Sequence, residues 1–419
     1  MTKHPHLNIR PAEVENKGQL QHDWLDTANP DEAAYVYAAQ GHRLATYEAD
    51  EYRYYCISQA AFAEIKKATD TLHEMFLNAT DFVLHDTKTL ERFNLPRSVW
   101  PRLRASWHHR KNQMITGRLD FAVSEQGIKI YEYNADSAAC YMECGKIQDK
   151  WARHFGCTEG VSAGKGLQAA LIAAWQKSKI KGIVHVMHDH DVDETYHALY
   201  MKSLMERAGL KCKAIKGTMG LSRRDDGVVV DPDGEPIRWV WKTWAWETAL
   251  DQIRGKHAGH KGQDIASTNK DSSPNLADVL LNEGAVVYEP FWTLITSNKA
   301  LLPVLWHMYP QHPYLLETQF ALTQTLKQTG YIIKPIVGRC GANIQVIHNN
   351  HLVLKTNGQF ENQHNIYQQY FPLPVINGNN VQISTFTVSG SFAGAVARMN
   401  PTQIIEADSN LLSLRVVED

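Results

Sequence analysis

The segment between residues 182 and 215 constrains the fold most, because its hydrophobic pattern changes period twice. Residues 182–187 form a short apolar run typical of a buried strand. After an acidic turn, the pattern predicts a helix to about Ala208, which Gly209 terminates. Residues 211–215 predict the next strand. A strand–helix–strand unit of this kind places at least part of the protein in the α/β class.

Elsewhere the chain is helical first and strand-rich later. Helical spacing of apolar residues predicts helices over residues 58–78 and near 100–110. Segment 254–275 lacks apolar periodicity and is typical of a long mobile loop, either a lid over a site or a surface insertion without a role. A largely antiparallel sheet is expected from short strands in the last third, at residues 331–337, 343–348, 352–356, 366–371, 381–388 and 393–398.

Length and composition exclude several classes of protein. With 419 residues the chain exceeds what one hydrophobic core usually supports, so two closely fused domains are expected. A formal net charge of −2 argues against a nucleic-acid partner. The most apolar stretch, residues 167–175, is about half of the roughly 20 residues that span a bilayer, so no membrane partner is expected. Six cysteines without disulfide spacing favour a cytoplasmic location.

The strongest chemical signal is a predicted hairpin over residues 118–134. In a strand, residues i and i+2 point to the same face, so Arg118 projects with Asp120 and Glu132 projects with Asn134. When the two arms pair, all four side chains converge on one face. Two carboxylates and an amide oxygen make a site suited to Mg²⁺, and Arg118 can bridge phosphate oxygens. The alternative is a set of cross-strand ion pairs on an exposed surface.

Two lysines stand beside apolar runs. Lys299 precedes Ala-Leu-Leu-Pro, and Lys334 lies within an apolar strand, where a lysine must either reach solvent or meet an anion. Residues 338–343 follow as a short glycine-containing loop whose backbone N–H groups suit phosphate, although its spacing matches neither a P-loop nor a Rossmann fingerprint. Residues 365–371 alternate amide and aromatic groups, which suits an adenine ring. Exposed charges and plain strand packing are the alternatives.

An acidic turn at residues 188–194 follows the strand at 182–187, at the end where open α/β sheets place ligands. Asp193 and Glu194 suit a cationic amine. The alternative is that Asp191 or Asp193 caps the following helix.

Several long blocks then resemble one family. The stretch GRLDFAVSEQGIKIYEYNADSA is similar to the metal-binding hairpin of the glutathionylspermidine synthase family. VWKTWAWETALDQI, EPFWTLITSNKALLPVLW, KPIVGRCGANI, NIYQQYFPLP and TFTVSGSFAGAVAR resemble further blocks of that family in the same order. The likeness runs from about residue 50 to the C-terminus.

The resemblance implies an ATP-grasp-like fold of mixed α/β class, with antiparallel sheets and a smaller α/β substrate-binding unit. That fold would occupy residues 51–419, with the smaller unit at about 165–250, and residues 1–50 would be a linker-like extension. In this family the metal hairpin precedes the lysines, as it does here.

The resemblance also implies roles for particular residues. Two Mg²⁺ ions would be bound by Asp120, Glu132 and Asn134. Arg118 would contact the transferred phosphoryl group as the catalytic residue. ATP would be held, besides Arg118, by Lys299, Lys334, Gly341, Gln368, Gln369, Tyr370, Phe371 and Gln403. Glutathione and the polyamine would be contacted by Ser137, Asp193, Glu194, Thr248 and Arg398.

The implied activity is an ATP-dependent acid–amine ligase that joins glutathione to spermidine through an acyl phosphate. The alternatives are a ligase of this family with another acid and amine, and a non-catalytic nucleotide-binding homologue. The upstream amidase domain of bifunctional members has no room in this chain, so product hydrolysis is not expected. Asn410 stands where an acidic substrate contact is expected, which leaves its role open. A homodimer is left open as well.

Overall fold

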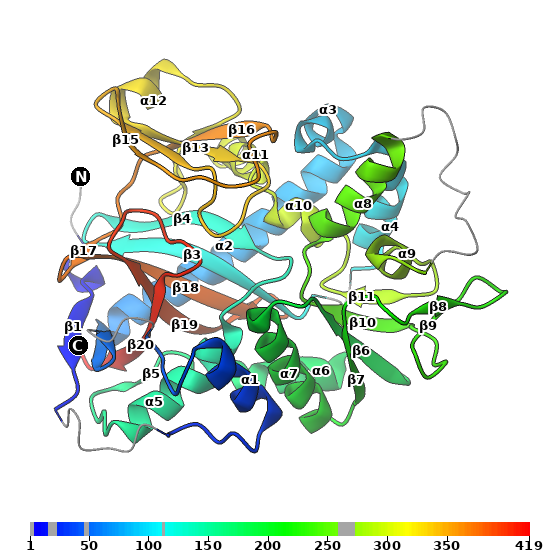
Figure 1. Cartoon of the computed structure of the whole chain (residues 1–419). Coiled ribbons are helices and arrows are strands. Elements are labelled where there is room, and N and C mark those ends of the chain that lie inside the picture. The colour runs from blue at the N-terminus through cyan, green and yellow to red at the C-terminus, as the bar shows by residue number, and fades with distance from the viewer. Residues whose placement is uncertain (1–3, 16–22, 46–49, 111–113, 259–272) are drawn as a thin grey trace.

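A nine-stranded sheet is the largest element of the protein, in a computed structural model that describes residues 4–15, 23–45, 50–110, 114–258 and 273–419 (Figure 1). Its main path runs β1-β2-β20-β19-β18-β3-β4, with β17 paired to β18 and β5 to β20. Among the described strands of this sheet, only β2 and β20 pair in parallel. The strands are β1 (Arg10–Glu13), β2 (Arg53–Ser58), β3 (Thr116–Ser124), β4 (Gly127–Asn134), β5 (Val161–Ser162), β17 (Val375–Ile376), β18 (Asn379–Val388), β19 (Ser391–Asn400) and β20 (Asn410–Val417).

Helix α2 (Gln59–His85) packs on this sheet and confirms the predicted helix at 58–78. It begins where Ser58 Oγ accepts a hydrogen bond from the Ala61 amide at 3.1 Å, a typical N-cap. Its apolar stripe is buried, and Thr69 Oγ1 lies 2.9 Å from Thr385 Oγ1 of β18. A polar contact inside an apolar interface fixes the position of the helix along the strand.

A second, parallel sheet has the order β11-β10-β6-β7. Its strands are β6 (Ile183–His188), β7 (Lys211–Lys216), β10 (Trp239–Lys242) and β11 (Val286–Tyr288). Helix α7 (Val192–Arg207) connects β6 to β7, which confirms the strand–helix–strand prediction. Because β11 lies beyond residue 250, this unit extends further along the chain than the sequence indicates.

A third sheet is entirely antiparallel, in the order β12-β16-β13-β14-β15, and lies above β3 and β4 in Figure 1. The predicted strands at 331–337, 343–348, 352–356 and 366–371 lie in it, whereas those at 381–388 and 393–398 belong to the nine-stranded sheet, so the expected antiparallel strands are divided between two sheets. Its strands are β12 (Thr318–Gln319), β13 (Tyr331–Pro335), β14 (Gln345–His348), β15 (His351–Lys355) and β16 (Asn365–Gln369). A short hairpin elsewhere consists of β8 (Ser222–Arg223) and β9 (Val229–Val230).

The remaining helices lie around and between the sheets. They are α1 (Pro30–Ala38), α3 (Thr87–Leu90), α4 (Trp100–His108), α5 (Gln148–His154), α6 (Leu167–Lys177), α8 (Trp246–Ala258), α9 (Leu276–Leu280), α10 (Thr293–Ser297), α11 (Leu301–Met308) and α12 (Gln324–Thr329). Single turns lie at Pro5–Leu7 (η1), Glu91–Phe93, Arg97–Val99 and Glu143–Ile147. No helix within the described ranges is long and apolar enough to cross a membrane.

The described parts of the first fifty residues contact the body of the fold rather than hang from it as a linker. Strand β1 pairs with β2, and α1 lies against α7 (Figure 1). Lys146 Nζ lies 2.7 Å from Asp31 and 2.8 Å from Glu32 on α1, and both carboxylates are buried. The sequence missed this because the contacts are made across long separations in the chain. The division into domains stays a prediction.

The predicted loop at 254–275 is corrected at both ends. Helix α8 continues to Ala258, and Asn275 caps α9 in a reciprocal capping box with Asp278. Residues 259–272 lie outside the described residues, and so does most of the predicted lid. Residues 410–417, where no strand is predicted from the sequence, form β20, a full strand of the largest sheet.

Glu289, which follows β11, ties the parallel sheet to the start of β3. Its carboxylate accepts hydrogen bonds from the Ile115 and Thr116 amides at 3.0 and 3.1 Å and is 2 % exposed. Burial raises the pKa of Glu289 to about 8, although the two amides and Lys242 lower it.

This carboxyl group should make stability depend on pH. The folded protein keeps the Glu289 proton up to about pH 8, whereas the unfolded chain releases it near pH 4.5. The native state therefore binds more protons between these values, and the free energy of unfolding falls as pH rises through the window, by an amount on the order of a few kcal/mol. Glu289→Gln stays neutral and loses this slope. Urea midpoints of both proteins at several pH values measure it, and parallel curves would contradict it.

Candidate active site

The predicted hairpin has the register that the sequence requires. Asp120 lies opposite Glu132 and Arg118 lies opposite Asn134, with the turn at residues 124–127. The Nδ2 of Asn134 donates to Asp120 at 3.1 Å and to Glu132 at 3.3 Å. The four side chains therefore meet on one face of β3 and β4, as expected. They are buried or half-buried, so the alternative of an exposed surface pattern is wrong.

Arg118 binds both carboxylate oxygens of Asp120 through one edge of its guanidinium group. Nε and Nη2 of Arg118 donate to Oδ1 and Oδ2 at 2.9 Å each, and Nη1 donates to the Ala139 carbonyl at 3.2 Å. Burial lowers the pKa of Arg118, but the negative charges beside it, first that of Asp120, raise it further, so the guanidinium stays charged. In this arrangement Arg118 faces the carboxylate that the sequence assigned to a metal.

The two predicted lysines lie near Glu132 of the hairpin. Lys299 Nζ lies 3.0 Å from Glu132 Oε2 and also donates to the Gly338 carbonyl at 3.0 Å. Lys334 Nζ donates to Gln368 Oε1 at 2.7 Å. Burial lowers the pKa of Lys334 to about 8. Burial raises the pKa of Glu132, yet the charges of Lys299 and Lys334 prevail and hold it at about 2.

A cavity of about 800 Å³, counting space open to solvent, lies beside the lysines. Tyr370, Phe371, Gln403 and Gly341 line it, as predicted for a nucleotide site. The hydroxyl of Tyr370 donates to Gln403 Oε1 at 3.2 Å. Gly341 has a φ of +67°, and an added Cβ would lie 2.5 Å from Ile404 Cγ2, so only glycine fits there.

Two predicted nucleotide contacts do not line this cavity. Gln368 is 1 % exposed and its amide is spent on Lys334. Gln369 accepts a hydrogen bond from the Glu317 amide at 3.4 Å through its side chain. Each side-chain amide is therefore engaged by another part of the protein.

A larger cleft of about 2480 Å³, also open to solvent, adjoins the first cavity and shares Glu132, Lys299 and Gly341 with it. Its lining carries side chains of both charges. Cations are supplied by Arg43, Arg118, Lys299, Arg339 and Arg398. Carboxylates outside the hairpin are supplied by Asp136, Glu143, Asp191, Asp193, Glu194 and Glu247. A cleft of this kind suits an anionic and a cationic ligand held side by side.

The predicted substrate residues mostly lie in this cleft. Ser137, Asp193, Glu194 and Arg398 line it. Burial raises the pKa of both Asp193 and Glu194, a cost that a bound cation would relieve. Asp191 is the helix cap, because its side chain accepts from the Asp193 amide at 2.9 Å.

Two residues fall elsewhere. Thr248 is absent from the cleft lining, where its neighbour Glu247 appears instead. Asn410 is fully buried and donates to Asp50 at 2.8 Å, so it does not face the cleft.

Sequence reasoning missed two contributors to the hairpin site. Ser384 of β18 donates to Asp120 Oδ1 at 2.7 Å, and Gln382, two residues earlier, lines both cavities. Their spacing within an otherwise apolar strand was the available signal. Tyr131 lines the smaller cavity because the register of the hairpin shifts after Asp120. Such a β-bulge is not visible in the sequence.

Asn298 was missed as well. Its Oδ1 accepts from the Ala300 amide at 2.9 Å, while its Nδ2 is buried and has no hydrogen-bond partner within the described chain. Asn298 is 6 % exposed and lines the cleft beside Lys299. A buried amide without a partner is costly, so this donor is expected to meet a ligand.

The family model described as "Glutathionylspermidine synthase preATP-grasp" matches residues 16–417, nearly the whole chain. The chain belongs to the glutathionylspermidine synthase family. The bifunctional glutathionylspermidine synthetase/amidase of Escherichia coli is 42% identical over 414 residues, which are 98% of this chain and 66% of that protein. Trypanothione synthetase of Crithidia fasciculata is 33% identical over 429 residues, 99% of this chain and 65% of that protein. The chain thus spans about two thirds of these relatives.

Two more distant likenesses add little to the family assignment. A putative acid–amine ligase of Haemophilus influenzae is 24% identical over 364 residues, 84% of this chain and 87% of that protein. A solved structure of a putative gamma-glutamylcysteine synthetase from Methylobacillus flagellatus has a TM-score of 0.35 and 10% identity, covering 83% of this chain and 85% of that one. A likeness at that level carries no argument. Membership of the glutathionylspermidine synthase family therefore rests on the sequence matches.

Proposed function

We propose that this glutathionylspermidine synthase homologue is an ATP-dependent carbon–nitrogen ligase that joins a carboxylic acid to an amine through an acyl phosphate. One observation carries the proposal. Glu132 and Lys299, which form an ion pair, line both the cavity that contains Lys334 and the larger cleft that contains Arg118, Asp120 and Asn134. Phosphoryl transfer between ligands in two adjoining cavities needs such a cluster at their boundary.

The chemistry assigns a task to each group. A carboxylate is a poor acylating agent, so its oxygen first attacks the γ-phosphorus of ATP and displaces ADP. Lys299 and Lys334 hold phosphate oxygens from the nucleotide side. Arg118 offers parallel N–H donors to the transferring group, whose charge these cations stabilise. The amine then attacks the acyl carbon, and phosphate leaves.

The hairpin has the right donor types for Mg²⁺. Asp120, Glu132 and Asn134 supply carboxylate and amide oxygens, the hard ligands that Mg²⁺ prefers. Asn134 currently directs its nitrogen at both carboxylates, so its amide must turn to present oxygen. These three residues would hold the ion, which when bound neutralises charge on phosphate oxygens.

The best candidate substrates are glutathione and spermidine. The names of the relatives contain both, and the charged groups of the cleft suit an anionic tripeptide and a polyamine. Arg398 lines the cleft and suits a glutathione carboxylate, whereas Asp193 and Glu194 suit ammonium groups. The family also includes a putative acid–amine ligase, so a different acid and amine is the second candidate.

Release of ADP tests the proposal. The purified chain with ATP and Mg²⁺ should release ADP rapidly only when glutathione and spermidine are both present. A panel in which each is replaced by another acid or amine identifies the true pair. No ADP release with any pair would leave only the non-catalytic alternative.

Glu194 should contribute to binding of the amine but not to binding of the acid. Glu194→Gln keeps the shape but removes the charge, so the KM for the amine should rise roughly tenfold, the cost of losing one charged hydrogen bond. The KM for the acid should stay within about twofold, since the acid is held by cations. Initial rates with each substrate varied in turn measure both values. An equal rise in the two would contradict this assignment.

Asn298 should act through its free amide N–H. Asn298→Asp keeps the oxygen that accepts from Ala300, so the local turn survives, but it replaces the donor with a negative charge. We expect kcat/KM for ATP to fall roughly 10- to 100-fold, because hydrogen bonds to charged groups contribute about 1.5–3 kcal/mol. Unchanged kcat/KM in a variant with unchanged Tm would show that this amide meets no ligand.

A further inference from the structure

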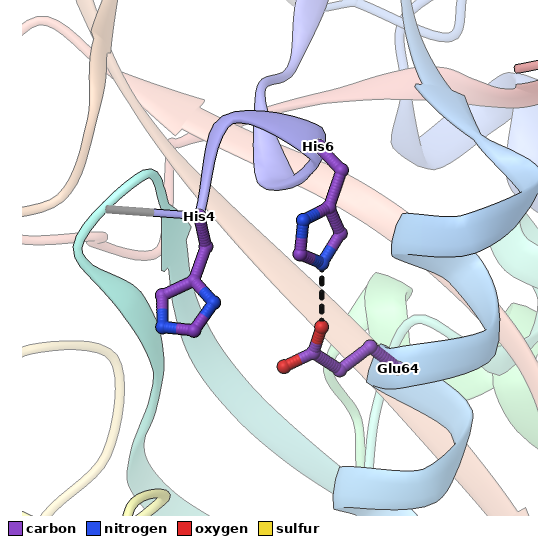
Figure 2. A group of neighbouring side chains, drawn as sticks. All are labelled: His4, His6 and Glu64. Atoms are coloured by element: carbon purple, nitrogen blue, oxygen red, sulfur yellow. Dashed lines mark hydrogen bonds and ion pairs between the residues drawn. The ribbon is translucent and has the colours of Figure 1, made fainter. Parts of the chain in front are cut away.

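Three side chains meet at a surface point formed by the N-terminal turn η1 and helix α2. His4, His6 and Glu64 each present one possible ligand atom, and these atoms lie within 4.8 Å of one another. Figure 2 shows the two imidazole rings and the carboxylate gathered around a common space. We propose that they form a binding site for a divalent transition metal of the zinc class, separate from the oxygen-rich hairpin.

The backbone that carries these residues is fixed by other contacts. The His4 amide donates to the Glu125 carbonyl at 2.7 Å, which attaches it to the turn between β3 and β4. The Leu7 amide donates to the His4 carbonyl at 2.9 Å, and the Leu7 side chain is fully buried in the core. Glu64 lies in the second turn of α2, whose first turn is capped by Ser58. The three ligands are therefore held near one another before any ion arrives.

The distances are compatible with a tetrahedral ion. Nitrogen and oxygen ligands lie about 2.1 Å from zinc, so neighbouring ligand atoms are roughly 3.4 Å apart in a tetrahedron. His6 Nε2 and Glu64 Oε2 are already 2.7 Å apart, and the third atom lies within 4.8 Å. Rotations about the side-chain bonds can move the ligand atoms by about 1 Å, which completes the geometry while the backbone stays in place.

The ligand types select the metal. Two imidazoles and one carboxylate suit Zn²⁺, Ni²⁺ or Cu²⁺, whereas Mg²⁺ prefers oxygen alone. Three protein ligands leave a fourth position, which solvent can fill because His6 is exposed. A bound ion would join the N-terminal turn to α2 and, through the His4 amide, to the hairpin turn. The simpler alternative is that His6 and Glu64 form only an ion pair.

Calorimetric titration with Zn²⁺ tests the site. The full chain is prepared without a histidine tag, stripped with a chelator and kept in excess Mg²⁺, which occupies oxygen sites. We expect one Zn²⁺ per chain, with affinity reduced at least about tenfold by His4→Ala, His6→Ala or Glu64→Gln. His85→Ala is the matched control, because His85 is an exposed histidine on the same helix. It should leave the affinity unchanged.

A second readout identifies the ligands. Bound Co²⁺ should give the visible absorption of a four-coordinate site without a thiolate charge-transfer band, which excludes the exposed thiol of Cys340. Affinity should also fall as pH is lowered, because protons compete for imidazole. Equal Zn²⁺ affinity in wild type and His6→Ala, a loss as large in His85→Ala, or no binding at all would each overturn the proposal.

Discussion

Asp120→Asn should lower kcat by roughly three orders of magnitude while the protein stays folded. Asparagine keeps the size of the side chain and an oxygen for the hydrogen bonds from Arg118 and Ser384. It removes the charge that a metal ion needs, and metal stabilisation of a transferring phosphoryl group contributes several kcal/mol. Turnover over a range of Mg²⁺ concentrations, with Tm as the control for folding, measures the effect. Normal turnover at low Mg²⁺ would contradict the metal assignment.

Asp120→Ala should also lose turnover, but it is the less informative variant. Asp120 is 2 % exposed and accepts two hydrogen bonds from one edge of the buried guanidinium of Arg118. Alanine would leave that charge without its partner, at a cost of about 3–5 kcal/mol of stability. Both variants remove the charge that faces Arg118, so both should lower Tm, and the fall should be larger for Asp120→Ala, which also loses the acceptor oxygens and the packed volume. Tm values of both variants equal to that of the wild type would show that the pair contributes little to folding.

Arg118→Lys should lower kcat about 10- to 100-fold and change the KM for ATP less than threefold. Lysine keeps the charge but cannot fork to two oxygens, so the loss should be felt where charge is transferred rather than where ATP is first bound. Steady-state kinetics with ATP varied at saturating acid and amine separate the two constants. A large rise in KM with unchanged kcat would reduce Arg118 to a ground-state contact.

Much of the hairpin site was predictable because strand alternation is a local rule. Residues two apart in a strand point to the same face. The spacing alone therefore predicted that Arg118 projects with Asp120 and that Glu132 projects with Asn134. The register that joins the arms followed from a short turn. The lysines were found because a charge inside an apolar run needs an anion or solvent.

What the sequence did not predict depends on contacts between distant segments. The pairing of β20 with β2 and the packing of α1 on α7 bring together residues from opposite ends of the chain or from separate units. No local period encodes such contacts. The bulge that turns Tyr131 into the smaller cavity is a break in the very alternation that the prediction used. No sequence pattern marks Asn298. The buried Nδ2 without a hydrogen-bond partner can be recognised only when the burial and the hydrogen bonds of the side chain are known.

Transfer of oxygen from the acid to phosphate tests the central claim most directly. Glutathione labelled with ¹⁸O in its glycine carboxylate is incubated with the chain, ATP, Mg²⁺ and spermidine, and the released phosphate is analysed by mass spectrometry. An acyl phosphate mechanism predicts one labelled oxygen in each phosphate formed with the amide, because the attacking carboxylate oxygen leaves with phosphorus. Amide formation with unlabelled phosphate would contradict the account.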